Sequence, residues 1–153
     1  MTTLKTLVIL SVCLIIGCGT IGGFDVRSFP TPKQKVVEAI DTLFAKYPEY
    51  DVPSNWQSFN DWKERGYDFL DSRLFYFRSA PEEMYYVTFL GDSNNIYKSG
   101  FTSLAIRAIN NGRGHWTLED EITSSEKSRI QSRFDKEIIA KIEDYIDSKA
   151  ISE

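Results

Sequence analysis

Histidine and cysteine are scarce in this chain. His115 is its single histidine, and its two cysteines are Cys13 and Cys18. A hydrolase of the Ser-His-Asp type would have to use His115, and no serine stands in a recognisable nucleophile elbow. The sequence therefore predicts no catalytic triad and favours a protein that is not an enzyme and needs no cofactor, although it does not decide the question.

An excess of positive charge is also missing. The 153 residues include 18 Lys and Arg against 22 Asp and Glu, for a net charge of −4. A nucleic-acid interface needs a basic face or stripe, so no nucleic-acid partner is expected. The turn "NNGRGH" lacks the following helix that would aim its amides at a phosphate. The length fits one domain, and no repeat of fixed period is present.

No apolar run is long enough to cross a membrane. The longest, Leu7–Ile16, covers ten residues, whereas a membrane-spanning helix needs about 20. It follows Lys5 at the N-terminus and ends in small residues. A cationic start, a short apolar core and small residues are typical of a secretory signal.

The end of this run carries a more specific pattern. Ile15-Ile16-Gly17-Cys18 resembles the lipobox of bacterial lipoproteins. The resemblance implies that a diacylglycerol group, carrying chains such as palmitate, is attached to the Cys18 sulfur. It also implies that the chain is cut after Gly17 and that the new amine is acylated. The alternative is ordinary signal cleavage that leaves a free thiol.

The resemblance also implies a location. Gly19 rather than Asp follows the cysteine, which by the sorting rule of proteobacterial lipoproteins favours the outer membrane, facing the periplasm. One acyl chain holds a protein only marginally, but several chains hold it for long periods. We therefore expect membrane lipid to be a partner through Cys18, which is left as the only cysteine and can form no internal disulfide.

These observations divide the chain into three parts. We expect residues 1–17 to be a signal peptide, residues 18–30 a lipidated tether, and residues 31–153 a single α+β domain. The tether carries Gly and Pro and no helical period. The alternative is that Phe24, Val26 and Phe29 form a short strand of the body.

Two helices are predicted around the central part of the domain. The first has Thr31 as N-cap and Pro32 at its first position, and it ends at Pro48. The second begins after Ser124 as N-cap. Apolar residues recur at spacings of three and four in both: Val36, Val37, Ile40, Leu43, Phe44 and Tyr47 in the first, and Ile130, Phe134, Ile138, Ile142, Tyr145 and Ile146 in the second.

Between the helices, four stretches rich in aromatic and β-branched residues read as strands. They cover residues 72–79, 83–90, 102–109 and 115–121, separated by turn residues. The expected fold is a four-stranded antiparallel meander with both helices on one face. Alternation assigns that face to Phe75, Phe77, Tyr85, Val87, Phe89, Leu104, Ile106, Ala108, Trp116 and Leu118.

The opposite face has a mixed composition. It would carry Leu74, Met84, Thr88, Thr117 and the five candidate binding residues Tyr76, Arg78, Tyr86, Arg107 and His115. If solvent reaches this face, Arg can bind a carboxylate or phosphate through two hydrogen bonds and Tyr adds rigid contact area. The alternative is an ordinary wet sheet face without function.

An aromatic segment precedes the first strand. Trp56, Phe59, Trp62 and Tyr67 lie within twelve residues. These rings could clamp a sugar, a peptide or a lipid, but aromatic residues dominate small cores. The favoured interpretation is that they plug one end of the sheet.

The sequence as a whole favours a non-catalytic binding or envelope-assembly lipoprotein with a possible envelope protein partner. The alternative is a small envelope hydrolase or an enzyme inhibitor that uses the loops near Asp92 and His115. "GDSNN" around Asp92 has only a superficial likeness to a hydrolase signature, because a downstream histidine at the expected spacing is missing. No metal site is expected.

Overall fold

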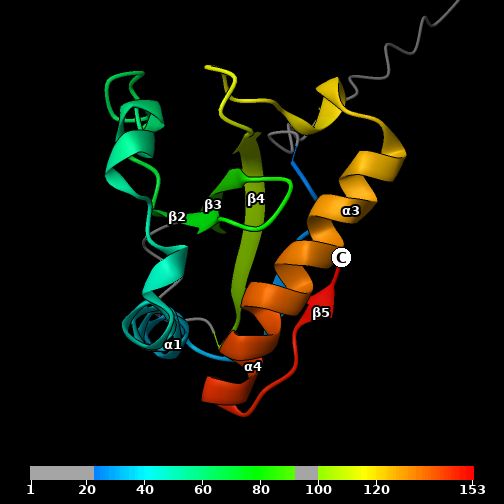
Figure 1. Ribbon diagram of the computed structural model, residues 1–153. Coiled ribbons are helices and arrows are strands. Elements are labelled where there is room, and N and C mark those ends of the chain that lie inside the picture. The colour runs from blue at the N-terminus through cyan, green and yellow to red at the C-terminus, as the bar shows by residue number, and fades with distance from the viewer. Residues whose placement is uncertain (1–22, 92–99) are drawn as a thin grey trace, which may run out of the picture.

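The computed structural model describes residues 23–91 and 100–153, which form an α+β fold around one antiparallel sheet (Figure 1). The strands are β1 (Arg27–Phe29), β2 (Ser72–Phe77), β3 (Glu83–Leu90), β4 (Thr102–Asn110) and β5 (Ile151–Ser152). The helices are α1 (Lys33–Lys46), α3 (Ser124–Phe134), the π turn η4 (Asp135–Ile139) and α4 (Ala140–Ile146). Short 3₁₀ turns occupy η1 (Pro48–Tyr50), η2 (Ser54–Phe59) and η3 (Glu119–Glu121).

The sheet has five strands in the order β2-β3-β4-β1-β5, so the expected number of four is wrong. The predicted meander is present in β2, β3 and β4, but the predicted strand at 115–121 is reduced to one bridge between Ile109 and Thr117. The chain then turns into η3, where the Glu121 carboxylate accepts a hydrogen bond from the Leu118 N–H at 2.6 Å. A side chain that binds nearby backbone in this way competes with strand pairing.

The strands missing from the prediction come from the two ends of the domain. β1 pairs with β4, from Arg27 opposite Leu104 to Phe29 opposite Thr102. β5 adds to the outer edge of β1. The short-strand alternative for residues 19–30 is therefore what the structure shows at Arg27–Phe29, where Phe29 is completely buried. The signal segment, the lipobox and the rest of the tether lie outside the described residues.

A bulge in β4 changes which residues share a face. Tyr86 pairs with Ala108 and Val87 pairs with Ile106, so Arg107 is an extra residue in β4. Beyond such an extra residue the alternation of side chains reverses. Ile109 joins the core under the helices, whereas Ala108 and Trp116, predicted to lie there, pack on the other face.

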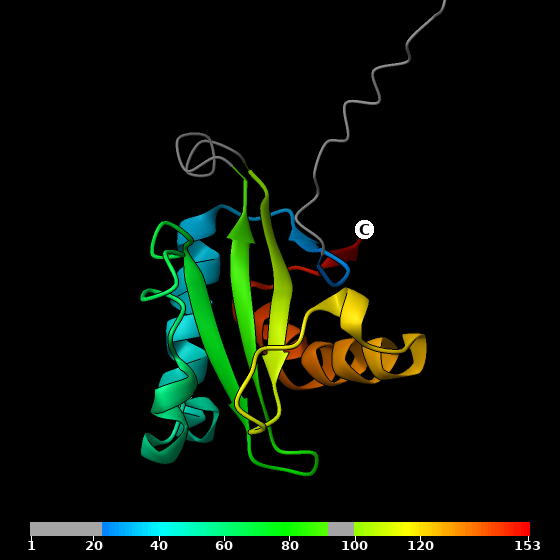
Figure 2. The same cartoon turned by 90° about the horizontal axis from the view of Figure 1, so that it is seen from above.

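Both helices cover the first face of the sheet, as predicted. In Figure 2 they lie behind the strands, and residues 111–118 lie in front. This helix-covered core joins aliphatic residues of α1, such as Ile40 and Leu43, to those of the C-terminal helix. It also holds Phe75, Phe77, Tyr85, Val87 and Phe89 from β2 and β3.

The C-terminal helix is continuous from Ser124 to Ile146 through the π turn. Its N-cap is Thr123 rather than Ser124, since the Thr123 hydroxyl accepts from the Glu126 N–H at 3.2 Å. Apolar residues at every fourth position would drift around an α-helix of about 3.6 residues per turn. The wider π turn corrects this drift, and Phe134, Ile138 and Ile142 are all buried against the sheet. Within the part of the chain that the structure describes, no helix has the length and apolar character to span a membrane.

Residues 51–71 cover the second face of the sheet, so the condition on which it would be a recognition surface, access to solvent, is not met over the aromatic residues. Trp56 and Trp62 are buried there with Tyr76, Met84, Tyr86, Ala108 and Trp116. We call this cluster the aromatic core. Sequence alternation could not reveal it, because the segment that covers the face has no regular period. Of the two interpretations of the aromatic segment, packing against the sheet fits this cluster better than a solvent-exposed clamp for a ligand does.

Candidate binding groove

The structure separates the five candidate binding residues. Tyr76 and Tyr86 are only 4% and 2% exposed, beneath the aromatic segment. Arg107 is half-buried, and Arg78 and His115 are exposed. Arg78 lies near Tyr76, whose pKa it acts to lower, and Arg107 lies near Tyr86, which acts to raise the pKa of Arg107. His115 lies in the turn that follows β4.

Tyr76 and Arg107 both have polar partners within the fold. The Tyr76 hydroxyl donates to the Glu82 carboxylate. Burial, with the added effect of Glu82, raises the pKa of Tyr76. Arg107 Nε donates to the Thr88 hydroxyl at 2.8 Å, and burial lowers the pKa of Arg107. Both side chains are therefore occupied by contacts within the fold. On this face of the sheet, their main role is to hold the structure together.

The aromatic core is built around Trp62. Its ring stacks on Tyr86, with centroids 4.0 Å apart and planes at 11°. Trp116 packs beside it at 5.0 Å, and Tyr67 contacts it edge-on at 5.4 Å. Offset and edge-on pairs of this kind add about 0.5–1.5 kcal/mol each beyond their buried area. These contacts hold the segment firmly on the strands although it contains no long helix.

The turn after β4 packs against Trp56, another ring of the aromatic core. Gly112 has φ +79°, and a Cβ there would lie 3.3 Å from the Trp56 ring. Only glycine readily combines this backbone with so close an approach. The Trp116 N–H donates to the Phe59 carbonyl at 2.9 Å and so ties this turn to the segment.

Two polar atoms of the aromatic core lack a hydrogen-bond partner among the described residues. They are Trp62 Nε1 and the Tyr86 hydroxyl, in the two stacked rings. A buried polar atom without a partner costs about 1–3 kcal/mol, and such atoms are uncommon in folded proteins. The buried polar atoms of this core are therefore less completely hydrogen-bonded than those of a purely structural core would be.

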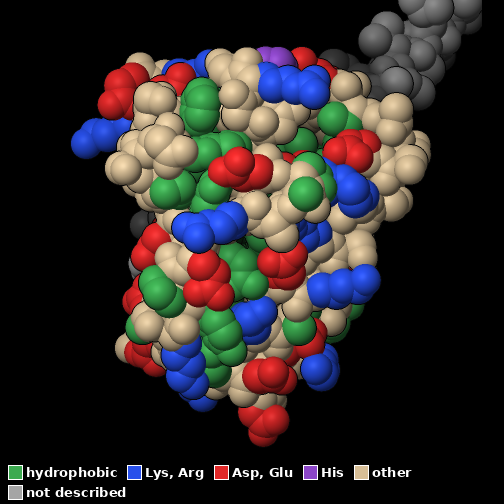
Figure 3. Space-filling model, in the orientation of Figure 1, with side chains coloured by type: hydrophobic (Ala, Val, Ile, Leu, Met, Phe, Trp, Pro, Cys, Tyr) green, Lys and Arg blue, Asp and Glu red, His purple; other side chains and the backbone are tan. Residues whose placement is uncertain are grey.

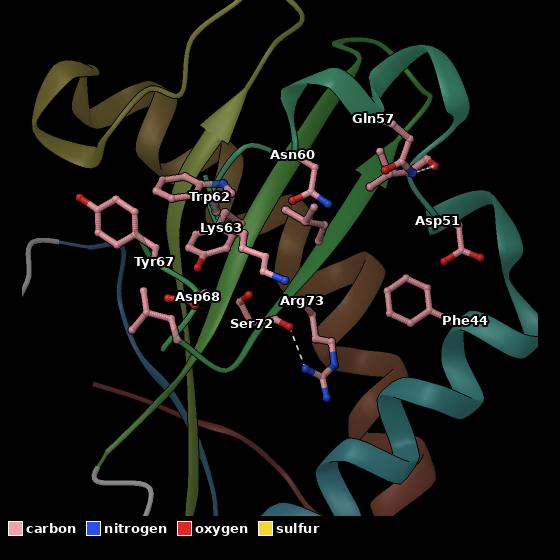
Figure 4. A pocket seen from close by; sticks show the side chains of 14 residues that line it. Phe44, Asp51, Gln57, Asn60, Trp62, Lys63, Tyr67, Asp68, Ser72 and Arg73 are labelled. Atoms are coloured by element: carbon pink, nitrogen blue, oxygen red, sulfur yellow. Dashed lines mark hydrogen bonds between the residues drawn. The ribbon is translucent and has the colours of Figure 1, made fainter. Parts of the chain in front are cut away.

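A groove of about 860 Å³ lies beside these rings, between the segment, β2 and the C-terminal part of α1. In Figure 4, Asn60 and Lys63 project from the segment, Ser72 and Arg73 lie at the strand below, and Phe44 and Asp51 form the far wall. Trp62, Tyr67 and Tyr86 complete the lining. The groove thus combines both signs of charge, two amides and aromatic surface.

One wall of the groove is fixed by an ion-pair cluster that includes the buried Lys33. Asp71 pairs with Lys33 at 2.5 Å and with Arg73 at 2.8 Å. Burial acts to raise the pKa of Asp71, but hydrogen bonds from Lys33 and Arg73 outweigh it and hold that pKa below its usual value. Lys33 and Arg73 also lie over the Phe89 ring, at 4.9 and 5.5 Å. Arg73 is therefore held in place at the groove before any ligand arrives.

A smaller hollow of about 290 Å³ lies on the other side of the Trp62–Tyr86 pair. Its rim carries Tyr67, Phe69 and Leu118, whose exposed fractions are 43%, 74% and 45%. We call these three residues the apolar rim. In Figure 3, the face drawn shows hydrophobic side chains interspersed with charges of both signs.

The groove presents charged, amide and aromatic side chains together. The described residues contain no group of His, Cys, Asp and Glu that could hold a metal ion. Sequence reasoning singled out Trp62 and Tyr67 but missed Lys63, Asn60 and Arg73. Only the concentration of rings could have drawn attention to this segment, because the polar groove residues follow no motif.

Comparisons with protein families, curated proteins and solved structures found no match to this chain.

Proposed function

We propose that this protein is a bacterial lipoprotein anchored through Cys18, and that it acts as a non-catalytic binding or envelope-assembly module. The observation that carries the binding role is the groove beside Trp62. It offers two cations, Lys63 and Arg73, with an amide donor and acceptor in Asn60. Such groups recognise carboxylates and backbone amides, and the rings supply apolar contact. An extended segment of an envelope protein fits this chemistry.

The anchor is supported by the lipobox-like sequence Ile15-Ile16-Gly17-Cys18 alone. Palmitate labelling tests it. We expect label on the wild-type protein, no label on Cys18→Ser, and a membrane fraction that contains only the wild type. An unlabelled wild-type protein whose mature chain starts at another residue would overturn the anchor.

The alternative, an envelope hydrolase or inhibitor, has less support. Its Asp92 lies outside the described residues, and His115 is an exposed residue of the turn after β4. His115→Ala separates the two functions. A binding protein should tolerate the change and still be crosslinked to its partner in cells, whereas an enzyme that uses this histidine should lose its activity.

A further inference from the structure

We propose that the apolar rim formed by Tyr67, Phe69 and Leu118 rests on the lipid bilayer and orients the anchored domain. The inference depends on the proposed lipid anchor at Cys18. It goes beyond that anchor, because it assigns a second, non-covalent membrane contact to a surface of the folded body.

The first support is the composition of the rim. Phe69 is 74% exposed, which makes it the most exposed large hydrophobic side chain in the part of the chain described here. Tyr67 and Leu118 lie with it around one hollow, although one comes from the segment before β2 and the other from the chain before η3. Grouped exposed apolar residues mark interaction surfaces, and Phe, Tyr and Leu suit the boundary between headgroups and acyl chains.

The second support is the place where the described chain begins. The Phe24 N–H donates to the Ile106 carbonyl at 3.2 Å, next to Arg107, which lines the hollow. Asp25 pairs with Lys127 at 3.2 Å, and Lys127 pairs with Glu119 at 2.8 Å. Glu119 also lines the hollow. Figures 1 and 2 both show this start of the chain beside η3.

The third support is the limited reach of the anchor. At full extension the chain from Cys18 to Gly23 spans at most about 18 Å. A domain of this size has a radius of gyration of about 14 Å and is therefore roughly 30 Å or more across. The tether is too short for the body to turn its opposite side to the bilayer. The surface around Phe24, with the neighbouring rim, is the one kept at the membrane.

The charges near the rim do not favour anionic lipid. Arg65 pairs with Asp61 at 2.9 Å, and Lys127 is shared between Asp25 and Glu119. Asp120 in the hollow and Asp68 between Tyr67 and Phe69 add exposed negative charge, so we expect apolar contact rather than charge to hold the rim at the bilayer. The groove shares Tyr67 with the rim but extends to Phe44 and Asp51, and we expect that part of it to stay open to a partner in the periplasm.

Spin labels test the contact in the lipidated full-length protein after its natural processing. Phe69→Cys and Leu118→Cys each introduce the only free thiol, because Cys13 is removed and Cys18 carries lipid. Asp144→Cys on α4 is the control, since α4 lies at the other end of the molecule in Figure 1. All three sites are exposed, so circular dichroism should show an unchanged fold.

The labelled proteins are reconstituted into phosphatidylcholine vesicles and into phosphatidylethanolamine–phosphatidylglycerol vesicles. We expect labels at 69 and 118 to be several-fold more accessible to oxygen, relative to a water-soluble nickel chelate, than the label at 144, in both lipids. Equal values at 69 and 144, with Cys18 shown to be palmitoylated, would overturn the rim contact while the anchor stands. Labels shielded from both reagents would overturn it in favour of contact between two copies of the chain, since no other protein is present in the vesicles. A Cys18 that carries no palmitate would overturn the anchor, and the rim contact with it.

Discussion

The two faces of the sheet are packed in different ways. The helix-covered core is closed by two regular helices, and its buried hydroxyl at Tyr85 donates to the Glu83 carboxylate at 2.9 Å. The aromatic core is closed by an irregular segment, and its buried hydroxyl at Tyr86 has no partner in the described part of the chain. Tyr85 and Tyr86 are neighbours in β3, so the same strand contributes one tyrosine to each core.

This difference separates stability from binding. The helix-covered core combines apolar packing with a paired tyrosine hydroxyl, and the one buried side-chain polar atom of α3 without a partner among the described residues is Gln131 Oε1. The aromatic core leaves polar atoms unpaired, and a groove and an exposed apolar rim lie at its edges. We therefore expect changes in the first core to affect unfolding, and changes at the edges of the second to affect binding.

The largest effect should come from Phe134→Ala in the helix-covered core. Phe134 is buried against Phe75 and Tyr85, with ring centroids at 6.0 and 6.5 Å. Removing a buried ring of this kind costs about 3–5 kcal/mol of unfolding free energy. Urea denaturation measures the loss, with the exposed Ser132→Ala as control. A loss as small as that of the control would show that the helix is not the main cover of the sheet.

The next effect concerns the buried charge that ties the C-terminal helix to β3. Glu83 is 2% exposed and accepts hydrogen bonds from Arg129 and Arg133. Glu83→Ala leaves these cations without their buried partner, and we expect a loss of about 3 kcal/mol. The exposed Glu64→Ala should change stability by no more than about 0.5 kcal/mol. Chemical denaturation of both variants decides whether Glu83 matters more than a surface carboxylate.

A smaller and sharper test uses the two tyrosines. Tyr85→Phe removes a hydrogen bond to a charged group and should cost about 2 kcal/mol. Tyr86→Phe removes a hydroxyl that has no partner in the described residues, so stability should change by less than about 0.5 kcal/mol or should rise. Equal losses in thermal or urea unfolding would mean that the two cores are equally satisfied and would remove the contrast between them.

The smallest effect is the pH dependence at the groove wall. Because the pKa of Asp71 is lowered in the folded protein, the stability it contributes is present above the unfolded value of about 3.9 and is lost as the pH falls through the folded one. Melting temperatures from about pH 6 to about pH 3 should fall less steeply for Asp71→Asn than for wild type. The exposed Asp144→Asn should follow wild type, and a wild-type slope for Asp71→Asn would contradict the assignment.

Periodicity predicted the parts of the fold in which each residue has regular neighbours. The apolar stripes of α1 and the C-terminal helix, and the alternation of β2 and β3, were visible in the sequence. β1 was foreseen only as the alternative for residues 19–30, and β5 was not foreseen, because strands of three and two residues gain their stability from pairing with distant parts of the chain. The bulge at Arg107 could not be predicted either, because the sequence of β4 does not show where an extra residue interrupts the pairing with β3.

The candidate site was predicted less well for a related reason. Alternation correctly placed Tyr76 and Tyr86 on the face opposite the helices, but it could not show that residues 51–71 cover that face. The polar residues of the groove, such as Lys63 and Arg73, come together only through this covering segment. Their sequence spacing therefore carried no information about the site.

Site-resolved crosslinking in cells tests the central claim most directly. A photoreactive residue replaces Gln57 at the groove or, as the matched control, Gln34 on α1; both glutamines are exposed. We expect the probe at 57 to form a discrete adduct with an envelope protein, and we expect Arg73→Glu to abolish it. The probe at 34 should form none. An adduct at 34 but not at 57 would contradict the account and move recognition to the helix side of the molecule.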